Sequence, residues 1–267
     1  MTVQLGGARV LLTGATGGLG QAIARALHAS GARLTLTGRR VDVLEPLAKE
    51  LAATSIAADL ASAADVRRLL DEAGRVDILI ANAALPGAGY VLDYTEEEID
   101  RVLDVNLRTP IVMARHAALA MRERGTGQIV LIGSLSGKAA SEQSAMYCAT
   151  KFGLRGFAHG LREDLHGTGV GVSLVLPGFV ADAGMFADAG APLQRGIRTV
   201  SPEAVVRSVL LAIARDRAEI SVAPFELRLG ATLGSIAPAL SAAVQRRAGA
   251  HKMASALAAG NRALGKR

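Results

Sequence analysis

Short apolar runs alternate along the chain with longer segments whose apolar residues recur at helical spacing. Seven runs are typical of strands: residues 8–13, 33–37, 77–83, 128–133 and 170–177, with weaker ones near 54–58 and 219–223. Helical patterns lie between them, at about 18–30, 41–53, 63–73, 95–124, 144–166 and 202–216. This alternation predicts an α/β fold, a doubly wound parallel sheet of about seven strands with helices on both faces.

The chain contains no linker, repeat or low-complexity segment, so its 267 residues predict a single domain over 1–267. No apolar run reaches the roughly 18 to 20 residues that cross a bilayer, which predicts no integral membrane span. The first residues lack a secretory signal pattern, and a cytoplasmic location is expected.

A single cysteine, Cys148, allows no intrachain disulfide, and the five histidines show no metal-binding spacing, so no metal site is expected.

The formal charge of +6 comes largely from arginines that are dispersed along the chain and interleaved with acids. No basic tract stands out, so a nucleic-acid partner is not expected. A small ligand that carries phosphate fits such basicity equally well.

A glycine-rich turn follows the first strand and opens the first helix, in the sequence TGATGGLG at residues 13–20. Glycines let the backbone turn tightly and expose N–H groups at the start of a helix, where phosphate binds favourably. In this strand-to-helix context the turn predicts a site for a dinucleotide pyrophosphate. The residues expected to contact it are Gly14, Thr16, Gly18, Leu19 and Gly20.

Two arginines follow the second strand, Arg39 and Arg40. A free ribose 2′-hydroxyl favours an acid at this point, whereas a 2′-phosphate favours arginine. The pair therefore favours NADP(H) over NAD(H). The alternative is that both arginines are solvated residues at the end of a strand, and Asp42 remains available for a ribose contact.

Tyr147 has a lysine, Lys151, four residues later, and Ser134 lies thirteen residues before it. Together with the Thr-Gly-x3-Gly-x-Gly turn, this constellation resembles the short-chain dehydrogenase/reductase family over residues 13–178. The resemblance implies a Rossmann-type fold. It also implies further cofactor contacts beyond the glycine turn, at Asp59, Leu60, Asn82, Tyr147, Lys151, Pro177 and Gly178.

The same residues suit hydride transfer to a carbonyl, because the developing oxyanion needs a proton from a positioned acid. Tyr147 is the expected donor, and a nearby Lys151 ammonium is expected to lower the phenol pKa of about 10. Ser134 is expected to orient the substrate oxygen. The resemblance implies that Lys151 also holds the nicotinamide ribose and that Asn106 holds a water beside Lys151.

Two positions depart from the family pattern. Ala84 stands where relatives have the glycine of an Asn-Ala-Gly motif, and Asp182 stands where they commonly have threonine. A carboxylate at 182 retains the ability to accept from the nicotinamide carboxamide.

The loop at 179–200 is too long for a simple connection and is expected to cover the substrate. Phe179, Met185 and Phe186 favour a hydrophobic ketone, aldehyde or secondary alcohol, although a surface flap packed on itself is an open alternative.

The extension at 225–267 carries apolar and basic residues at loosely helical spacing. It is expected to pack on the domain, to cover the pocket or to contact another subunit. Binding to a membrane surface is one alternative, and a frayed tail past Ala250 is another.

The sequence thus predicts an NADP(H)-dependent carbonyl reductase or alcohol dehydrogenase that acts on a small molecule. A homodimer or homotetramer is implied by the family resemblance alone. Two alternatives remain. The first is a 3-oxoacyl-thioester reductase that recognises an acyl carrier through surface arginines such as Arg101, Arg108 or Arg155. The second is an NADP(H)-binding regulator without turnover.

Overall fold

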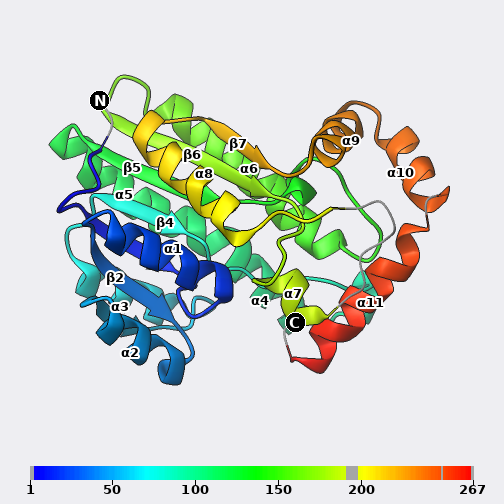
Figure 1. Cartoon of the computed structure of the whole chain (residues 1–267), viewed down its shortest axis with the longest axis horizontal. Coiled ribbons are helices and arrows are strands. Elements are labelled where there is room, and N and C mark those ends of the chain that lie inside the picture. The colour runs from blue at the N-terminus through cyan, green and yellow to red at the C-terminus, as the bar shows by residue number, and fades with distance from the viewer. Residues whose placement is uncertain (1–2, 191–197, 248, 266–267) are drawn as a thin grey trace.

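The computed structural model describes residues 3–190, 198–247 and 249–265. Their strands form one parallel sheet in the order β3-β2-β1-β4-β5-β6-β7 (Figure 1). The strands are β1 (Arg9–Thr13), β2 (Arg33–Gly38), β3 (Thr54–Ala57), β4 (Ile78–Ala81), β5 (Gly127–Ile132), β6 (Val170–Pro177) and β7 (Glu219–Val222). The predicted doubly wound sheet is confirmed, including both weaker strands.

Helices cover both faces of this sheet (Figure 1). On one face lie α1 (Gly18–Ala29), α2 (Val41–Glu50) and α8 (Pro202–Arg215), and on the other α3 (Ala63–Ala73), α4 (Glu96–Leu103), α5 (Thr109–Arg124) and α6 (Ala145–Asp164). Side chains of β1 alternate between the two cores: Leu11 packs on the α5 side, and Val10 and Leu12 pack on the α1 side. Burial on both faces explains why the strands are nearly continuous apolar runs.

The predicted single helix at 95–124 is wrong in its middle. A π-helical turn at Asp104–Arg108 separates α4 from α5. Pro110 lies at the start of α5 and has no N–H to donate to the carbonyl of Asn106, so the regular helical ladder cannot continue through this point. Proline in the first turn of a new helix is well tolerated.

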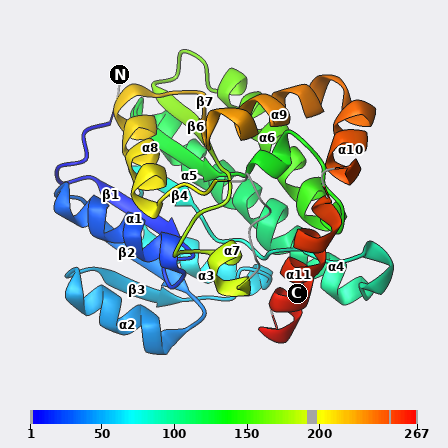
Figure 2. The same ribbon diagram turned by 45° about the vertical axis from the view of Figure 1, so that its right-hand side comes forward.

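The carboxy-terminal extension forms three helices, α9 (Phe225–Ile236), α10 (Pro238–Arg247) and α11 (Ala250–Ala263). In both ribbon views, α9 and α10 lie at the end of the molecule opposite to β3 and α2 (Figures 1 and 2). α11 packs against the short helix α7 (Met185–Ala189) of the loop after β6. Among the described residues, no helix combines the length and apolarity that crossing a membrane requires.

Candidate active site

The carboxyl ends of β1, β4, β5 and β6 border a cavity of about 1180 Å³. β1 and β4 are neighbours although β2 and β3 lie between them in the chain, so the strand order reverses here, and such a switch point is where open α/β sheets bind ligands. The cavity extends from the glycine turn to the three carboxy-terminal helices. All the proposed cofactor contacts line it, from Gly14 through Gly178.

The glycine turn has room for a ligand against its backbone. Gly14 has a φ of +66°, which side chains rarely adopt, and a Cβ on Gly20 would overlap the carbonyl oxygen of Gly14. α1 begins here without a side-chain cap and without an acid in its first turn. Its free N–H groups and the positive end of its dipole therefore fit a pyrophosphate. Asn82 fixes the turn from β4 by donating to the carbonyl oxygens of Thr13 and Gly14, at 3.0 and 3.2 Å.

The two arginines after β2, Arg39 and Arg40, differ in their contacts with the rest of the protein. Arg40 donates to the carbonyl oxygen of Thr16 and so braces the glycine turn. Arg39 is exposed and has no hydrogen-bond partner among the described residues. Its guanidinium is therefore available for a ligand, whereas that of Arg40 is already engaged.

Asp59 lines the cavity beyond the arginines, but its carboxylate is held by the protein. Arg101 Nη2 lies 2.9 and 3.2 Å from its two oxygens, and the N–H of Ala61 donates to it at 3.1 Å. Burial raises the pKa of Asp59, but these hydrogen bonds outweigh burial and hold it below its usual value. Asp59 thus stays ionised at the edge of the cavity.

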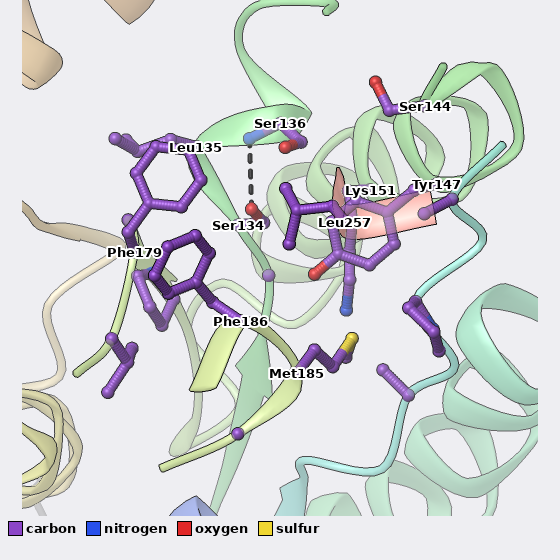
Figure 3. Close-up of a pocket in the computed structure, with 18 of the residues that line it drawn as sticks. Ser134, Leu135, Ser136, Ser144, Tyr147, Lys151, Phe179, Met185, Phe186 and Leu257 are labelled. Carbon is purple, nitrogen blue, oxygen red and sulfur yellow. Dashed lines mark hydrogen bonds between the residues drawn. The ribbon is translucent and has the colours of Figure 1, made fainter. Parts of the chain in front are cut away.

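Ser134, Tyr147 and Lys151 meet at the end of β5 (Figure 3). Ser134 follows the strand, while Tyr147 and Lys151 share one face of α6, as their spacing predicts. The Tyr147 hydroxyl and the Lys151 ammonium point toward the same part of the cavity (Figure 3). Lys151 Nζ lies 5.5 Å from the centre of the Tyr147 ring and donates to the carbonyl oxygen of Ile132 at 3.0 Å.

The expected lowering of the Tyr147 pKa by Lys151 is not observed. Burial raises the pKa of Tyr147 to about 12, and a hydrogen bond with Ser134 opposes this only in part. Burial also lowers the pKa of Lys151 to about 8. Both shifts have one physical cause, because a site with few water contacts disfavours phenolate and ammonium alike.

Asn106 is fully buried in the π-helical turn and does not line the cavity. Its side-chain oxygen accepts from the N–H of Leu85 at 2.6 Å, and its Nδ2 donates to the carbonyl of Leu85 at 2.8 Å and to Thr150 Oγ1 at 3.4 Å. Thr150 immediately precedes Lys151. The side chain therefore ties the segment after β4 to the catalytic face of α6, and its contacts are with protein groups.

Two glycines near α6 were not recognised as site residues from the sequence. A Cβ on Gly137 would lie 2.6 Å from the carbonyl oxygen of Lys151, and one on Gly87 would lie 3.0 Å from the backbone nitrogen of Tyr147. Gly87 also has a φ of +51°. Both glycines let a loop approach the helix that carries Tyr147 and Lys151. The sequence Pro86-Gly87 is typical of a turn, and it could have indicated the loop that contains Gly87.

The far end of the cavity is apolar. Phe179 and Phe186 pack with ring centres 5.1 Å apart, and Met185 and Leu257 of α11 lie beside the same space (Figure 3). Of the predicted loop 179–200, residues 191–197 lie outside the described residues. Ala84 lines the cavity, but Asp182 is exposed and does not. The contact suggested for the Asp182 carboxylate therefore has no support in this arrangement.

The three surface arginines considered for acyl-carrier recognition all lie in ion pairs. Arg101 pairs with Asp59, Arg108 with Asp104 at 3.9 Å, and Arg155 with Glu219 at 2.6 Å. None of them is a free positive charge.

Comparison with known proteins identifies the family. The short chain dehydrogenase family model matches residues 8–193. The chain is 35% identical over 229 residues to the ketoacyl reductase HetN of Nostoc sp., covering 82% of this chain and 79% of that protein. It is 33% identical over 180 residues to the 3-oxoacyl-[acyl-carrier-protein] reductase FabG of Rickettsia conorii, covering 67% and 75%.

Two solved structures share the fold. A short-chain dehydrogenase from Sphingobium yanoikuyae in complex with NADPH has a TM-score of 0.76 at 28% identity, with 88% of this chain and 95% of that one covered. The closed form of a serine dehydrogenase complexed with NADP⁺ has a TM-score of 0.73 at 29% identity, with 82% and 95% covered. The chain belongs to the short-chain dehydrogenase/reductase family and is an oxidoreductase that uses a nicotinamide cofactor.

Proposed function

We propose that the protein is an NADP(H)-dependent reductase of hydrophobic ketones or aldehydes, or a dehydrogenase of the corresponding secondary alcohols. The observation that carries the proposal is the meeting of Ser134, Tyr147 and Lys151 at one point of a cavity. That cavity has the glycine turn at one end and an apolar wall at the other. The first end fits a dinucleotide and the second fits an apolar substrate.

When bound along the glycine turn, the nicotinamide cofactor would supply the hydride that the carbonyl carbon accepts. Ser134 and Tyr147 place two hydroxyl groups where the carbonyl oxygen would lie, and these donors stabilise the negative charge that develops on it. Tyr147 then gives its proton to that oxygen. Lys151, as the ammonium form, would bind the ribose hydroxyls and favour the phenolate that remains.

A raised phenol pKa does not remove Tyr147 from this role. The oxyanion formed by hydride transfer is about as basic as hydroxide, the conjugate base of water, and so is more basic than phenolate. A phenol with a pKa of about 12 is still the stronger acid, so the proton moves downhill. In the reverse direction, the positive charge of the oxidised nicotinamide would lower the Tyr147 pKa and make the phenolate a better base.

Arg39 supports the preference for NADP(H). Its free guanidinium lies at the end of β2 beside the cavity, where the ribose of the adenosine half would lie. Asp59, the acid that lines this part of the cavity, is paired with Arg101. Within the cavity lining, a 2′-phosphate at this point therefore meets the unpaired Arg39, while the carboxylate of Asp59 is already held by Arg101.

A 3-oxoacyl thioester is the second candidate substrate. Both HetN and FabG are named as reductases of ketoacyl groups, and the cavity continues past the catalytic residues among Phe186, Met185 and Leu257. An acyl chain fits such a wall. Since Arg101, Arg108 and Arg155 are all paired, a carrier protein would need other contacts.

We also infer that the protein assembles as a homodimer or homotetramer through α5 and α6. Leu119 on α5 and Phe152 on α6 are exposed large apolar residues, and helices with such exposed positions are suited to an interface.

The deciding experiment is a panel of ketones, aldehydes and alcohols, together with an acetoacetyl thioester, followed by nicotinamide absorbance with each cofactor. The proposal predicts turnover of an apolar carbonyl with NADPH well above the rate with NADH. Binding of NADPH without oxidation by any carbonyl, even in a single turnover, would instead support a regulator that has lost activity.

A further inference from the structure

The basic excess of the chain lies entirely in its last part. Residues 227–267 contain seven lysines and arginines and no aspartate or glutamate. The remaining 226 residues contain 23 basic and 24 acidic residues, a net charge of −1. Arginine is dispersed along the chain, as the sequence pattern suggested, but the net positive charge is not.

The same part of the chain exposes a row of large apolar side chains, which we call the apolar stripe: Phe225, Leu229, Leu233 and Ile236 on α9, and Leu240 and Val244 on α10. The α9 members recur at intervals of three and four residues, so they share one helix face. Phe225 is 71%, Ile236 77% and Leu240 64% exposed.

The opposite face of α9 is the one that packs on the protein. Ala231 and Gly234 are buried, and a Cβ on Gly234 would lie 2.6 Å from Cβ of Ala139. Ser235 donates to the carbonyl of Lys138 at 2.8 Å. The helix is thus fixed by its small residues, and the orientation of the apolar stripe away from the core is a consequence of this packing.

Unpaired cations flank the stripe. Arg228 lies on α9, Arg246 and Arg247 end α10, and Lys252 lies in the first turn of α11; within the described ranges none of the four forms an ion pair. Glu226, the acid nearest in sequence, is bound by Arg198 at 2.8 and 2.9 Å. Glu226 is also the only acid within α9 and α10, so these two helices offer an occupant apolar groups and positive charge while their one carboxylate is already paired.

We propose that α9 and α10 dock on an anionic lipid surface, with the apolar stripe in the acyl region and the cations at the headgroups. Helices that lie in a membrane interface combine such an apolar face with lysine and arginine. A second copy of the chain is disfavoured as occupant, because it would bring like charges together.

The docking face also contains the rim of the cavity. Leu233, Leu240 and Val244 belong to the apolar stripe and line the cavity as well. The lipid surface would therefore lie against the apolar end of the site. The proposal itself does not depend on the reaction.

The test is sedimentation of the full chain with vesicles of phosphatidylcholine, alone and with phosphatidylglycerol. We expect binding only to the anionic vesicles, weakened by salt because surface charge is screened. Leu229→Asp should lower the partition coefficient at least about tenfold. Leu211→Asp, at a similarly exposed leucine on α8, is the matched control and should leave it unchanged.

A second pair of variants tests the charge without touching the apolar stripe. Replacing Arg246 and Arg247 by alanine should weaken binding about fivefold for each arginine. Replacing Arg215 and Arg217, exposed arginines near the end of α8, should have no such effect. Tyr147→Phe should bind vesicles normally, so failure of the proposed reaction and failure of docking are distinguishable.

Three results would overturn the proposal. The first is equal binding to neutral and anionic vesicles, or binding to neither. The second is a fall in oligomer mass on Leu229→Asp in sedimentation velocity, which would make the apolar stripe a subunit interface. The third is capture of an acidic acyl carrier protein, weakened by the same variants, without vesicle binding.

Discussion

At the scale of single residues, the structure separates side chains that the sequence could not tell apart. Arg39 and Arg40 are adjacent and chemically identical, yet one is free and the other holds the carbonyl of Thr16. The meeting of Ser134, Tyr147 and Lys151 could be predicted from the sequence. The spacing of four residues puts Tyr147 and Lys151 on one helix face, and Ser134 follows a predicted strand. The pKa values of Tyr147 and Lys151 were not predictable, since their burial depends on the loops and carboxy-terminal helices around them.

The two arginines lead to different expected phenotypes. Arg39→Ala should weaken NADPH binding about tenfold or more and leave NADH nearly unchanged, because only NADPH carries the 2′-phosphate. Arg40→Ala should weaken both cofactors by similar factors, because it loosens the turn that holds the shared pyrophosphate. Fluorescence titration of each variant with each cofactor measures this, and equal losses for both cofactors in Arg39→Ala would exclude its phosphate role.

Lys151 should set an upper pH limit for carbonyl reduction. Its pKa is lowered to about 8, so the ammonium is lost as the pH rises through this value, whereas Tyr147 keeps its proton up to about pH 12. The expected kcat/KM for reduction is flat below about pH 7 and falls above about pH 8. The same inflection should persist in the residual activity of Tyr147→Phe. A profile that stays flat to pH 10 would contradict the assignment to Lys151.

At the scale of elements, hydrophobic periodicity was enough to locate all seven strands and the main helices around them. The π-helical turn at Asp104–Arg108 was missed because an apolar pattern does not register which backbone bonds are made. Pro110 was the residue in the sequence that indicated an interruption of the helix at this point. The positions of α9 to α11 on the domain could not be predicted from the apolar pattern either. Small residues such as Gly234 and Gly260 fix these helices by packing against Ala139 and Ala189, which are far from them in the sequence.

The hydrogen bonds of Asn106, which we call the Asn106 clamp, join the π-helical turn, the segment after β4 and α6. Asn106→Ala would leave the N–H and carbonyl of Leu85 buried without partners, so we expect a loss of about 2 to 4 kcal/mol in the free energy of unfolding. Asn106→Asp keeps the acceptor for the Leu85 N–H and should be less destabilising at low pH than at neutral pH. Urea denaturation measures both, and a loss below about 0.5 kcal/mol in Asn106→Ala would show that the clamp is unimportant.

At the scale of the whole molecule, Glu219 connects parts that are distant in sequence. Its carboxylate accepts from Arg155 at 2.6 Å and His159 at 3.0 Å on α6, and from Lys138 at 2.6 Å in the loop that follows Ser134. Burial raises its pKa, but the three hydrogen bonds prevail and lower it to about 2. The network thus links β7, α6 and the catalytic loop.

This network predicts a pH-dependent contribution to stability. The folded pKa of Glu219 lies below its ordinary value of 4.5, so the contribution is complete above about pH 5 and is lost as the pH falls toward 2. Glu219→Gln should therefore be destabilised relative to the unchanged protein at pH 6, and the difference should shrink by pH 3.5. Urea titrations at both pH values measure it. A difference that does not change with pH would show that the charge of Glu219 is not responsible.

The central claim is that Tyr147 donates the proton that completes carbonyl reduction, and Tyr147→Phe tests it most directly. The substitution removes only the hydroxyl and should leave NADPH binding within a factor of about three. Single-turnover oxidation of bound NADPH by the best carbonyl of the panel should slow at least about a hundredfold, the size of a general-acid contribution. Turnover within about threefold of the unchanged enzyme, with NADPH bound normally, would contradict the account.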